Sequence, residues 1–462
     1  MHTSYPTVRS MARSIAAGEI SPVTAVEASL ARLEETEPKL RSFVTVLADT
    51  ARQAAKRAET QASSAARGPL FGVPVSVKDL IAVADAPLTF GSRSMAGNVA
   101  RNDAVAVERL RRAGAIIIGK TTTSEFGCKA VGESPLTGST RNPWNLSKTA
   151  GGSSAGAAAS VAAGVTPVAI GTDGGGSIRI PAALTGLFGV KAQFGRVPVF
   201  PVATTPTLAH VCPIGRDVRD VAMLLGVLAG FDERDPHSVR DSFPDWLRAC
   251  ERDTRHLKVA WSPSFGYANP DPEVREVAEA AVRAIAGMGC VVEEIDAPFD
   301  DPADLWTAEF YAGVGTRLET VLHEQRALLD PDVATIVERA LAQPAQAYYR
   351  AQHRRYDFRE RVRAFFERFD LLLSPTLPVA GVDAGVSVPR GIAGRNIVTW
   401  VCYTYPFNLT GQPAASIPAG FTQDGLPVGL QIVSRAYRED DLFSIAAALE
   451  AARPWAAHVP PL

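Results

Sequence analysis

The chain has 462 residues, of which 46% are hydrophobic and 21% charged, a balance typical of a globular protein with a large core. Its 47 Lys and Arg residues nearly balance its 49 Asp and Glu residues, so it lacks the basic excess that nucleic-acid-binding proteins carry. Five dispersed cysteines argue against a disulfide framework and a closely spaced zinc site, and favour a reduced cytoplasmic protein.

We expect neither a membrane span nor a secretion signal. The longest apolar stretches are residues 155–170, which polar residues, glycine and proline interrupt, and residues 221–230, which are too few to cross a bilayer. Residues 1–20 lack the continuous apolar region of a signal peptide.

Residues 1–66 are predicted to form a helical N-terminal layer. From residue 22 onward, apolar residues recur at helical spacing among many Ala, Glu and Arg residues. Ser21 followed by Pro22 is a typical helix start, with serine as the N-cap and proline at the first helical position.

Residues 67–215 show an α/β pattern and hold the motifs discussed below. We predict a strand over 71–78, a helix over 105–113 and a buried strand over 115–118. Glycine is dense from 151 to 195, where apolar runs between the glycines indicate a tightly folded segment.

Residues 216–462 are predicted to complete the same core. Helices are expected over 216–230, 272–287 and the charged stretch 303–368, and strands over 291–295, 371–373 and within 408–433. Without an internal repeat or a linker, the simplest prediction is a single α/β domain spanning residues 1–462.

Ser177 is a candidate nucleophile because it follows three consecutive glycines. Backbone N–H groups of Gly174, Gly175 and Gly176 can converge on one point, since no Cβ blocks the approach, and such donors stabilise an oxyanion. A glycine-rich turn with a serine N-cap for the next helix explains the same residues equally well.

Lys78 is a candidate base. It ends an apolar run that begins at Val73, so its amine is expected to be partly desolvated and hence partly neutral. A lysine that ends a strand and reaches solvent is the plainer alternative. None of the seven histidines lies in a comparably special context, so the sequence does not point to a Ser-His-Asp triad.

Several ordered motifs resemble the amidase signature family. Gly-Gly-Ser-Ser-Ala-Gly at 151–156 followed by Gly-Thr-Asp-Gly-Gly-Gly-Ser-Ile-Arg-Ile-Pro at 171–181 resembles its defining motif, and Gly-Val-Pro-Val-Ser-Val-Lys-Asp at 72–79 resembles its lysine-bearing segment. Further segments at 119–126, 142–144, 189–191 and 408–414 follow the family pattern, and the resemblance extends over nearly the whole chain.

The resemblance implies a twisted mixed sheet covered by helices on both faces, and a Ser-Ser-Lys triad. In that triad Ser177 is the nucleophile, Ser153 the bridging serine after a cis peptide bond, and Lys78 the base. The N–H groups of residues 174–177 would form the oxyanion hole, supported by Ser154, Thr172, Asp173 and Arg179. No metal or organic cofactor is required. Ala155 and Cys212 each replace a glycine common in the family, away from the triad.

The expected reaction is amide hydrolysis through an acyl-enzyme, on a small-molecule amide or carbamate. One alternative is the amidase subunit of a tRNA-dependent amidotransferase. Another is an esterase whose nucleophile is Ser154 in a Gly-x-Ser-x-Gly elbow, which lacks the required preceding strand. A nucleotide-binding module is disfavoured because no phosphate-binding loop motif occurs.

Candidate pocket segments are residues 128–136, 306–314 and 397–405, the last with Trp400 and Tyr403. Their aromatic and small apolar content slightly favours a neutral or aryl substrate, with aryl carbamates (urethanes) as secondary substrates. We expect no nucleic-acid or membrane partner; a homodimer is compatible with the resemblance but not specified by the sequence.

Overall fold

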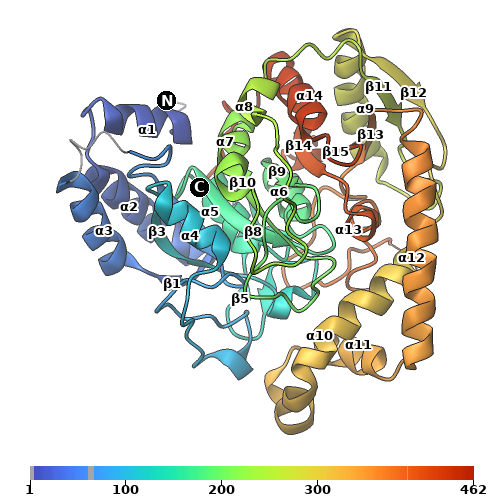
Figure 1. Cartoon of the computed structure of the whole chain (residues 1–462), viewed down its shortest axis with the longest axis horizontal. Helices are drawn as coiled ribbons and strands as arrows, with labels where there is room; N and C mark the ends of the chain where they lie inside the picture. Colours follow the sequence, from blue (N-terminus) through green and yellow to red (C-terminus); the bar gives the residue numbers. More distant parts are fainter. Residues whose placement is uncertain (1–4, 61–66, 393) are drawn as a thin grey trace.

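A mixed sheet of eleven strands runs through the molecule, as Figure 1 shows for the computed structural model, which describes residues 5–60, 67–392 and 394–462. In spatial order the strands are β1 (Phe43–Val46), β3 (Ile116–Thr121), β2 (Pro74–Lys78), β8 (Val168–Asp173), β10 (His210–Gly215), β9 (Phe188–Lys191), β14 (Ala414–Phe421), β15 (Pro427–Ser434), β13 (Leu371–Pro375), β11 (Lys258–Trp261) and β12 (Val291–Glu294). Strand β2 lies parallel to both β3 and β8, whereas the central strands β8, β10, β9, β14 and β15 pair antiparallel.

Helices surround this sheet (Figure 1). In chain order they are α1 (Val8–Ala16), α2 (Pro22–Leu40), α3 (Ala48–Thr60), α4 (Val105–Arg112), α5 (Ala155–Ala162), α6 (Arg179–Thr185), α7 (Val218–Leu228), α8 (Trp246–Ala249), α9 (Pro272–Gly287), α10 (Ala303–Gln325), α11 (Pro331–Leu341), α12 (Ala345–Phe365), α13 (Pro406–Thr410) and α14 (Glu439–Ala452). Two small hairpins, β4 (Glu133–Ser134) with β5 (Gly138–Ser139) and β6 (Arg141–Asn142) with β7 (Asn145–Thr149), lie outside the large sheet.

Both faces of the sheet are buried, because successive residues of a strand point to opposite sides. In β8, Val168 and Ile170 belong to a core shared with α4, α7, α9 and α14, whereas Ala169 packs with α5 and α6. In β13, Leu372 belongs to a further core with α10, α11 and α12. This arrangement confirms the predicted single α/β domain with a mixed sheet and helices on both faces.

The predicted N-terminal layer is helical but interrupted. Helix α2 begins at the expected cap, where Ser21 accepts a hydrogen bond from the backbone N–H of Thr24 and Pro22 occupies the first turn. It ends at Arg41 in a left-handed conformation, and the chain then forms strand β1 at the sheet edge before α3. The rest of the predicted segment, at 1–4 and 61–66, lies outside the described residues.

The stretch 303–368, predicted to be helical, forms three separate helices. Pro331 and Pro344 mark the breaks, since proline has no N–H to continue the helical hydrogen bonds and each begins or caps the next helix. In Figure 1, α10 and α11 lie at the bottom of the view and α12 runs along its right side. The other predicted helices and strands agree with the structure within a few residues, but the prediction that no strand precedes Ser154 is wrong, because β7 forms there.

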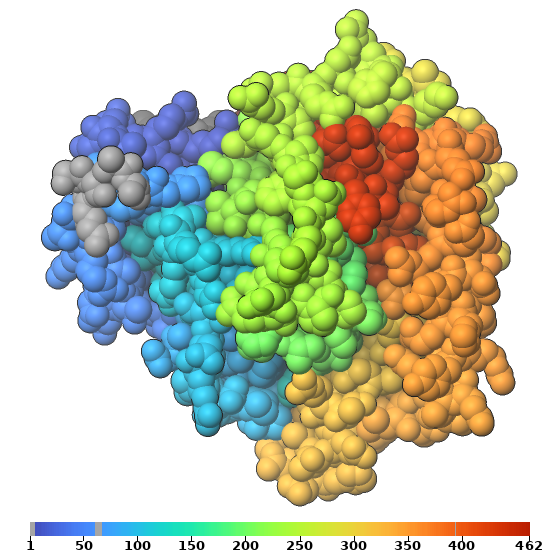
Figure 2. All heavy atoms as spheres, viewed as in Figure 1, coloured from blue at the N-terminus to red at the C-terminus, as the bar shows by residue number. Residues whose placement is uncertain are grey.

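Figure 2 shows the same face with all atoms drawn; the yellow-green residues, which include α7 and α8, lie over its centre between the N-terminal and C-terminal parts. Among the described residues, no helix combines the length and apolarity needed to cross a membrane. The boundaries proposed inside the domain, at residues 66 and 215, remain predictions.

Candidate active site

Lys78 and Thr172 lie side by side because β2 and β8 are parallel neighbours. Lys78 is the last residue of β2, and Thr172 is near the end of β8, so both lie at the carboxyl ends of these strands. The Lys78 amine is fully buried and donates to Thr172 Oγ1 at 2.7 Å. The sequence prediction that this lysine is desolvated therefore agrees with its burial.

Ser153 meets the same amine from the turn that precedes α5. Its Oγ accepts a hydrogen bond from Lys78 Nζ at 2.7 Å, and the Gly152–Ser153 peptide bond is cis, as the family resemblance implies. The next residue, Ser154, is buried, and its Oγ donates to the backbone carbonyl of Thr172 at 3.1 Å. Two neighbouring serines thus have different surroundings: one faces an amine, the other joins α5 to β8.

The buried pair Asp173 and Arg179 fixes the glycine loop, which comprises residues 173–177. The carboxylate of Asp173 accepts two hydrogen bonds from Arg179, at 3.0 Å each, and one from Asn408 Nδ2 at 2.9 Å. Burial acts to raise the pKa of Asp173, but the Arg179 guanidinium outweighs it, so the pKa lies well below its usual value. Both side chains are fully buried, so this charged pair fixes the loop and does not face substrate.

The N–H groups of the glycine loop are not all available to a ligand. Gly176 N–H donates to Asp173 Oδ1 at 2.8 Å, because the carboxylate lies under the turn. The N–H of Gly176, which the sequence analysis predicted as an oxyanion donor, therefore already has a partner within the loop. Gly174 lines the cavity described next, and Gly175 lies between these two residues.

Ser177 and Ser153 line one cavity of about 320 Å³. The backbone carbonyl of Ser177 accepts a hydrogen bond from Ser154 N–H at 3.2 Å, which attaches the loop carrying Ser177 to the turn carrying Ser153. Ser177 is only partly buried, whereas Ser154 is buried and does not line the cavity. The cavity is a suitable size for a small organic ligand.

The wall of this cavity is mainly apolar. Leucine, methionine, valine and phenylalanine side chains dominate it, and Arg317 is the one charged side chain among the described residues that line it. The apolar lining residues include Leu80, Ile81, Leu88, Phe90, Met95, Phe126, Val199, Phe200, Phe310, Leu318 and Val321.

Most of the residues predicted from the sequence to line the pocket do not line this cavity. From residues 306–314 only Phe310 lines the cavity, and residues 128–136 and 397–405 contribute none of its lining. Trp400 and Tyr403 instead pack in the core beside α10–α12. The sequence prediction missed residues 80–95 and the loop 198–205; in the loop, apolar residues between prolines were the available signal.

Burial governs the chemistry of Lys78. It lowers the pKa of the amine well below the usual lysine value, because the charged form loses hydration, while the Asp173 carboxylate opposes this effect. A lysine so placed holds a proton less tightly and can accept one from a hydroxyl group. The described residues include no group of three or more His, Cys, Asp or Glu side chains placed to hold a metal ion.

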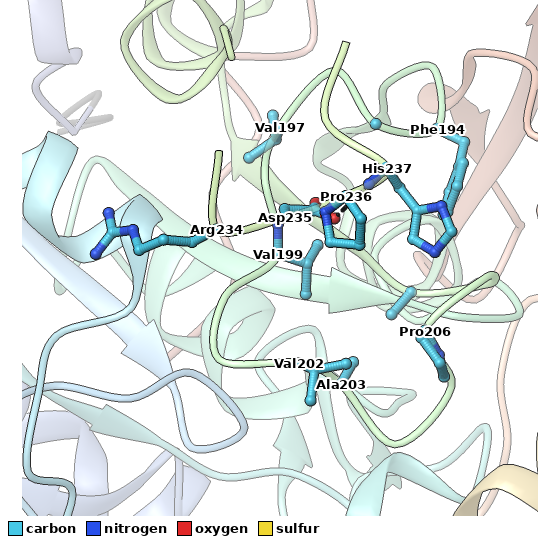
Figure 3. A pocket seen from close by; sticks show the side chains of 12 residues that line it. Phe194, Val197, Val199, Val202, Ala203, Pro206, Arg234, Asp235, Pro236 and His237 are labelled. Atoms are coloured by element: carbon cyan, nitrogen blue, oxygen red, sulfur yellow. Dashed lines mark hydrogen bonds between the residues drawn. The ribbon is translucent and has the colours of Figure 1, made fainter. Parts of the chain in front are cut away.

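A second, smaller cavity of about 90 Å³ lies beside the first, and Val199, Val202 and Ala203 line both (Figure 3). Its two charged side chains have structural partners: Arg234 forms ion pairs with Asp232 and Glu108, and the Asp235 carboxylate accepts from Val199 N–H. The cavity that Ser153 and Ser177 line is the candidate active site.

Comparison with known proteins shows the family of this chain. The family model described as Amidase matches residues 24–443. The chain is 37% identical to an acylamidase of Rhodococcus erythropolis over 454 residues, covering 96% of this chain and 95% of that protein. It is also 37% identical to a glutamyl-tRNA(Gln) amidotransferase subunit of Symbiobacterium thermophilum over 465 residues, covering 94% of each.

Solved structures show the same likeness. A bacterial aryl acylamidase of the amidase signature enzymes superposes with a TM-score of 0.93 at 30% identity, covering 98% of this chain and 97% of that one. A 6-aminohexanoate cyclic dimer hydrolase gives a TM-score of 0.92 at 30% identity, covering 99% of both. On sequence and structure together, the chain belongs to the amidase signature family and is a hydrolase of amide C–N bonds.

Proposed function

We propose that this chain hydrolyses carboxylic amides with apolar acyl or aryl groups through an acyl-enzyme on Ser177. The observation that carries the proposal is the hydrogen bond of 2.7 Å between the buried Lys78 amine and Ser153 Oγ, at a cavity that Ser177 also lines. A neutral amine beside a hydroxyl group, with a second hydroxyl group facing the same space, can relay a proton.

The first half-reaction forms the acyl-enzyme. Ser177 Oγ loses its proton to Ser153, which passes one to Lys78, and Ser177 attacks the amide carbonyl carbon. The tetrahedral oxyanion accepts hydrogen bonds from backbone N–H groups of the loop, for which Gly174, Gly175 and Ser177 itself are the proposed donors. Ser153 returns a proton to the leaving nitrogen, because an amide nitrogen leaves poorly as an anion.

The second half-reaction releases the acid. Water enters the site left by the amine, loses a proton through Ser153 to Lys78, and attacks the acyl-enzyme carbonyl. Collapse of the second tetrahedral intermediate breaks the ester bond and returns the proton to Ser177. The same steps apply to an aryl carbamate, which we propose as a secondary substrate.

The apolar wall of the cavity favours an apolar acyl group. Burial of such a group against side chains such as Leu88, Phe90 and Phe310 is favourable by about 25 cal/mol for each Å² removed from water. A relative and a solved structure carry the name acylamidase, and we extend acylamide hydrolysis from those names to this chain. Function as an amidotransferase subunit is the second candidate, because a relative of that name is equally similar.

Kinetics with p-nitroanilides of increasing acyl length test the proposal. We expect kcat/KM to rise from acetyl to hexanoyl or benzoyl, and glutamine to be a poor substrate of the purified chain. Efficient hydrolysis of glutamine with no activity on the anilides would favour the amidotransferase alternative.

Mass spectrometry of the acyl-enzyme tests the nucleophile. A slowly turned-over aryl carbamate should add its acyl mass to Ser177. Ser177→Ala should abolish the adduct, whereas Ser154→Ala should still form it, because Ser154 Oγ faces the backbone of Thr172 rather than the cavity. An adduct that persists in Ser177→Ala would disprove the proposed nucleophile.

A further inference from the structure

Three successive carbonyl groups of the glycine loop are held by side chains from other parts of the fold. Asp173 O accepts from Asn408 Nδ2 at 3.1 Å and lies 3.1 Å from His210 Nδ1. Gly174 O accepts from Trp306 Nε1 at 2.9 Å, and Gly175 O accepts from Thr404 Oγ1 at 2.6 Å. Each peptide unit from 173 to 175 is therefore fixed from outside the loop.

Holding a carbonyl group also orients the next N–H group. A trans peptide unit is planar, and its C=O and N–H bonds point in opposite directions. The hydrogen bond from Trp306 to Gly174 O therefore directs the N–H of Gly175 away from the indole. Thr404 acts in the same way on the N–H of Gly176, which already donates to Asp173.

The indole of Trp306 is itself rigidly placed. It is about 1% exposed and stacks on Phe310 at a centroid distance of 4.5 Å and on Tyr405 at 5.8 Å. A Cβ atom at Gly175 would lie 2.6 Å from Trp306 Cζ2, so the loop lies directly against the ring. Trp306 does not line the cavity, but its stacking partner Phe310 does.

We propose that Trp306 is a positioning residue that aims the N–H of Gly175 at the oxyanion of the tetrahedral intermediate. The proposal rests on the proposed function, because it needs Ser177 to form that intermediate. Trp306 touches no substrate atom; it acts through the hydrogen bond to Gly174 O. Its loss should thus weaken binding of the transition state and leave binding of the substrate nearly unchanged.

Trp306→Phe removes the indole N–H and keeps an aromatic ring. We expect kcat for a p-nitroanilide to fall about 10- to 100-fold, somewhat less than the loss of a whole oxyanion donor, with KM within threefold. Affinity for benzeneboronic acid, whose tetrahedral adduct with Ser177 resembles the intermediate, should fall by a similar factor.

Trp246→Phe is the matched control. Trp246 is also a buried tryptophan, but its Nε1 has no hydrogen-bond partner among the described residues and it lies in another core. In this variant kcat, KM and the affinity for benzeneboronic acid should all stay within twofold of wild type. If it loses as much kcat as Trp306→Phe, the effect is general loosening of the fold and the inference fails.

A second substitution covers the case in which Trp306→Phe folds poorly. Benzothienylalanine at position 306 has the same bicyclic shape with sulfur in place of the N–H group, and it should reproduce the loss of kcat and of boronic acid affinity. An unchanged kcat, or a raised KM with unchanged kcat, would overturn the inference. Wild-type protein that neither hydrolyses anilides nor binds the boronic acid would instead overturn the proposed function.

Discussion

Lys78 and Lys191 are both fully buried lysines at the ends of strands of the same sheet, yet their amines face different groups. Lys78 Nζ donates to two hydroxyl groups, those of Ser153 and Thr172. Lys191 Nζ donates to the carbonyl oxygens of Gln412 and Ala192 and lies 3.4 Å from His210 Nε2. Burial is the first cause of a lowered pKa in both, and the pKa of Lys191 falls to about 7.

The difference separates a lowered pKa from the ability to relay a proton. A carbonyl oxygen accepts a hydrogen bond but has no proton to pass on, whereas a hydroxyl group can give one proton as it takes another. Lys191 therefore joins strands, while Lys78 can exchange protons with Ser153. Lys120 is a third case, since its buried amine forms an ion pair with Asp79 at 2.7 Å.

Replacing each lysine in turn is the strongest test of whether the two amines differ in function. Lys78→Ala should lower kcat for an anilide by about 10³-fold or more, because the relay loses its final proton acceptor. Lys191→Met should lower it less than tenfold. Steady-state kinetics on both purified variants make the measurement, with circular dichroism as the check of folding. Similar losses in the two variants, or activity of Lys78→Ala within tenfold of wild type, would contradict the assignment.

The pH profile gives the next largest effect. Because Lys78 accepts a proton only when neutral, log kcat/KM should rise by about one unit per pH unit below its pKa and level off above it. That pKa lies well below the usual lysine value, so the plateau should begin before pH 10.5. The residual activity of Lys78→Ala should lack this rise, and a bell-shaped profile with an acidic limb near pH 6.5 would point to a histidine instead.

The sequence predicted which residues meet at the site better than which residues line it. Lys78, Ser153 and Ser177 lie in short motifs that resemble those of the family, and the structure places the three residues beside one another. The cavity lining comes from segments that are distant in sequence and meet only in the folded chain, and apolar letters such as those around Trp400 serve the core equally well. The use of Gly176 N–H by Asp173 likewise depends on a backbone turn that composition does not specify.

The dependence of stability on pH tests the titration of Lys191. With a pKa of about 7 in the folded chain and 10.5 as its ordinary value, Lys191 binds fewer protons when folded than when unfolded between these two pH values. The free energy of unfolding should therefore rise with pH in this window, by at most about 1.4 kcal/mol per pH unit from this residue.

Urea unfolding of wild type and Lys191→Met at pH 7, 8 and 9 measures this contribution. The stability of the wild type relative to the variant should increase as the pH rises, because the methionine side chain of the variant has no proton to lose. A constant difference across the three pH values would mean that Lys191 keeps its proton when folded, so its carbonyl partners would hold it as an ammonium ion.

Thr172→Val should have the smallest effect on activity of the substitutions at or beside Lys78. It removes one of the two hydroxyl acceptors of Lys78 and keeps the shape of the side chain, leaving Ser153 Oγ as the remaining partner. A hydroxyl acceptor stabilises the ammonium form, so its loss should lower the pKa of Lys78 further and move the pH–activity curve to lower pH.

The amine of this variant is also held less firmly toward Ser153, and we expect plateau kcat to fall about threefold, the effect of losing one modest hydrogen bond. These opposite effects predict that the variant is slower than wild type on the plateau and closer to it, or faster, on the rising limb. A uniform loss at all pH values would mean that Thr172 only positions β8 and does not influence the proton affinity of Lys78.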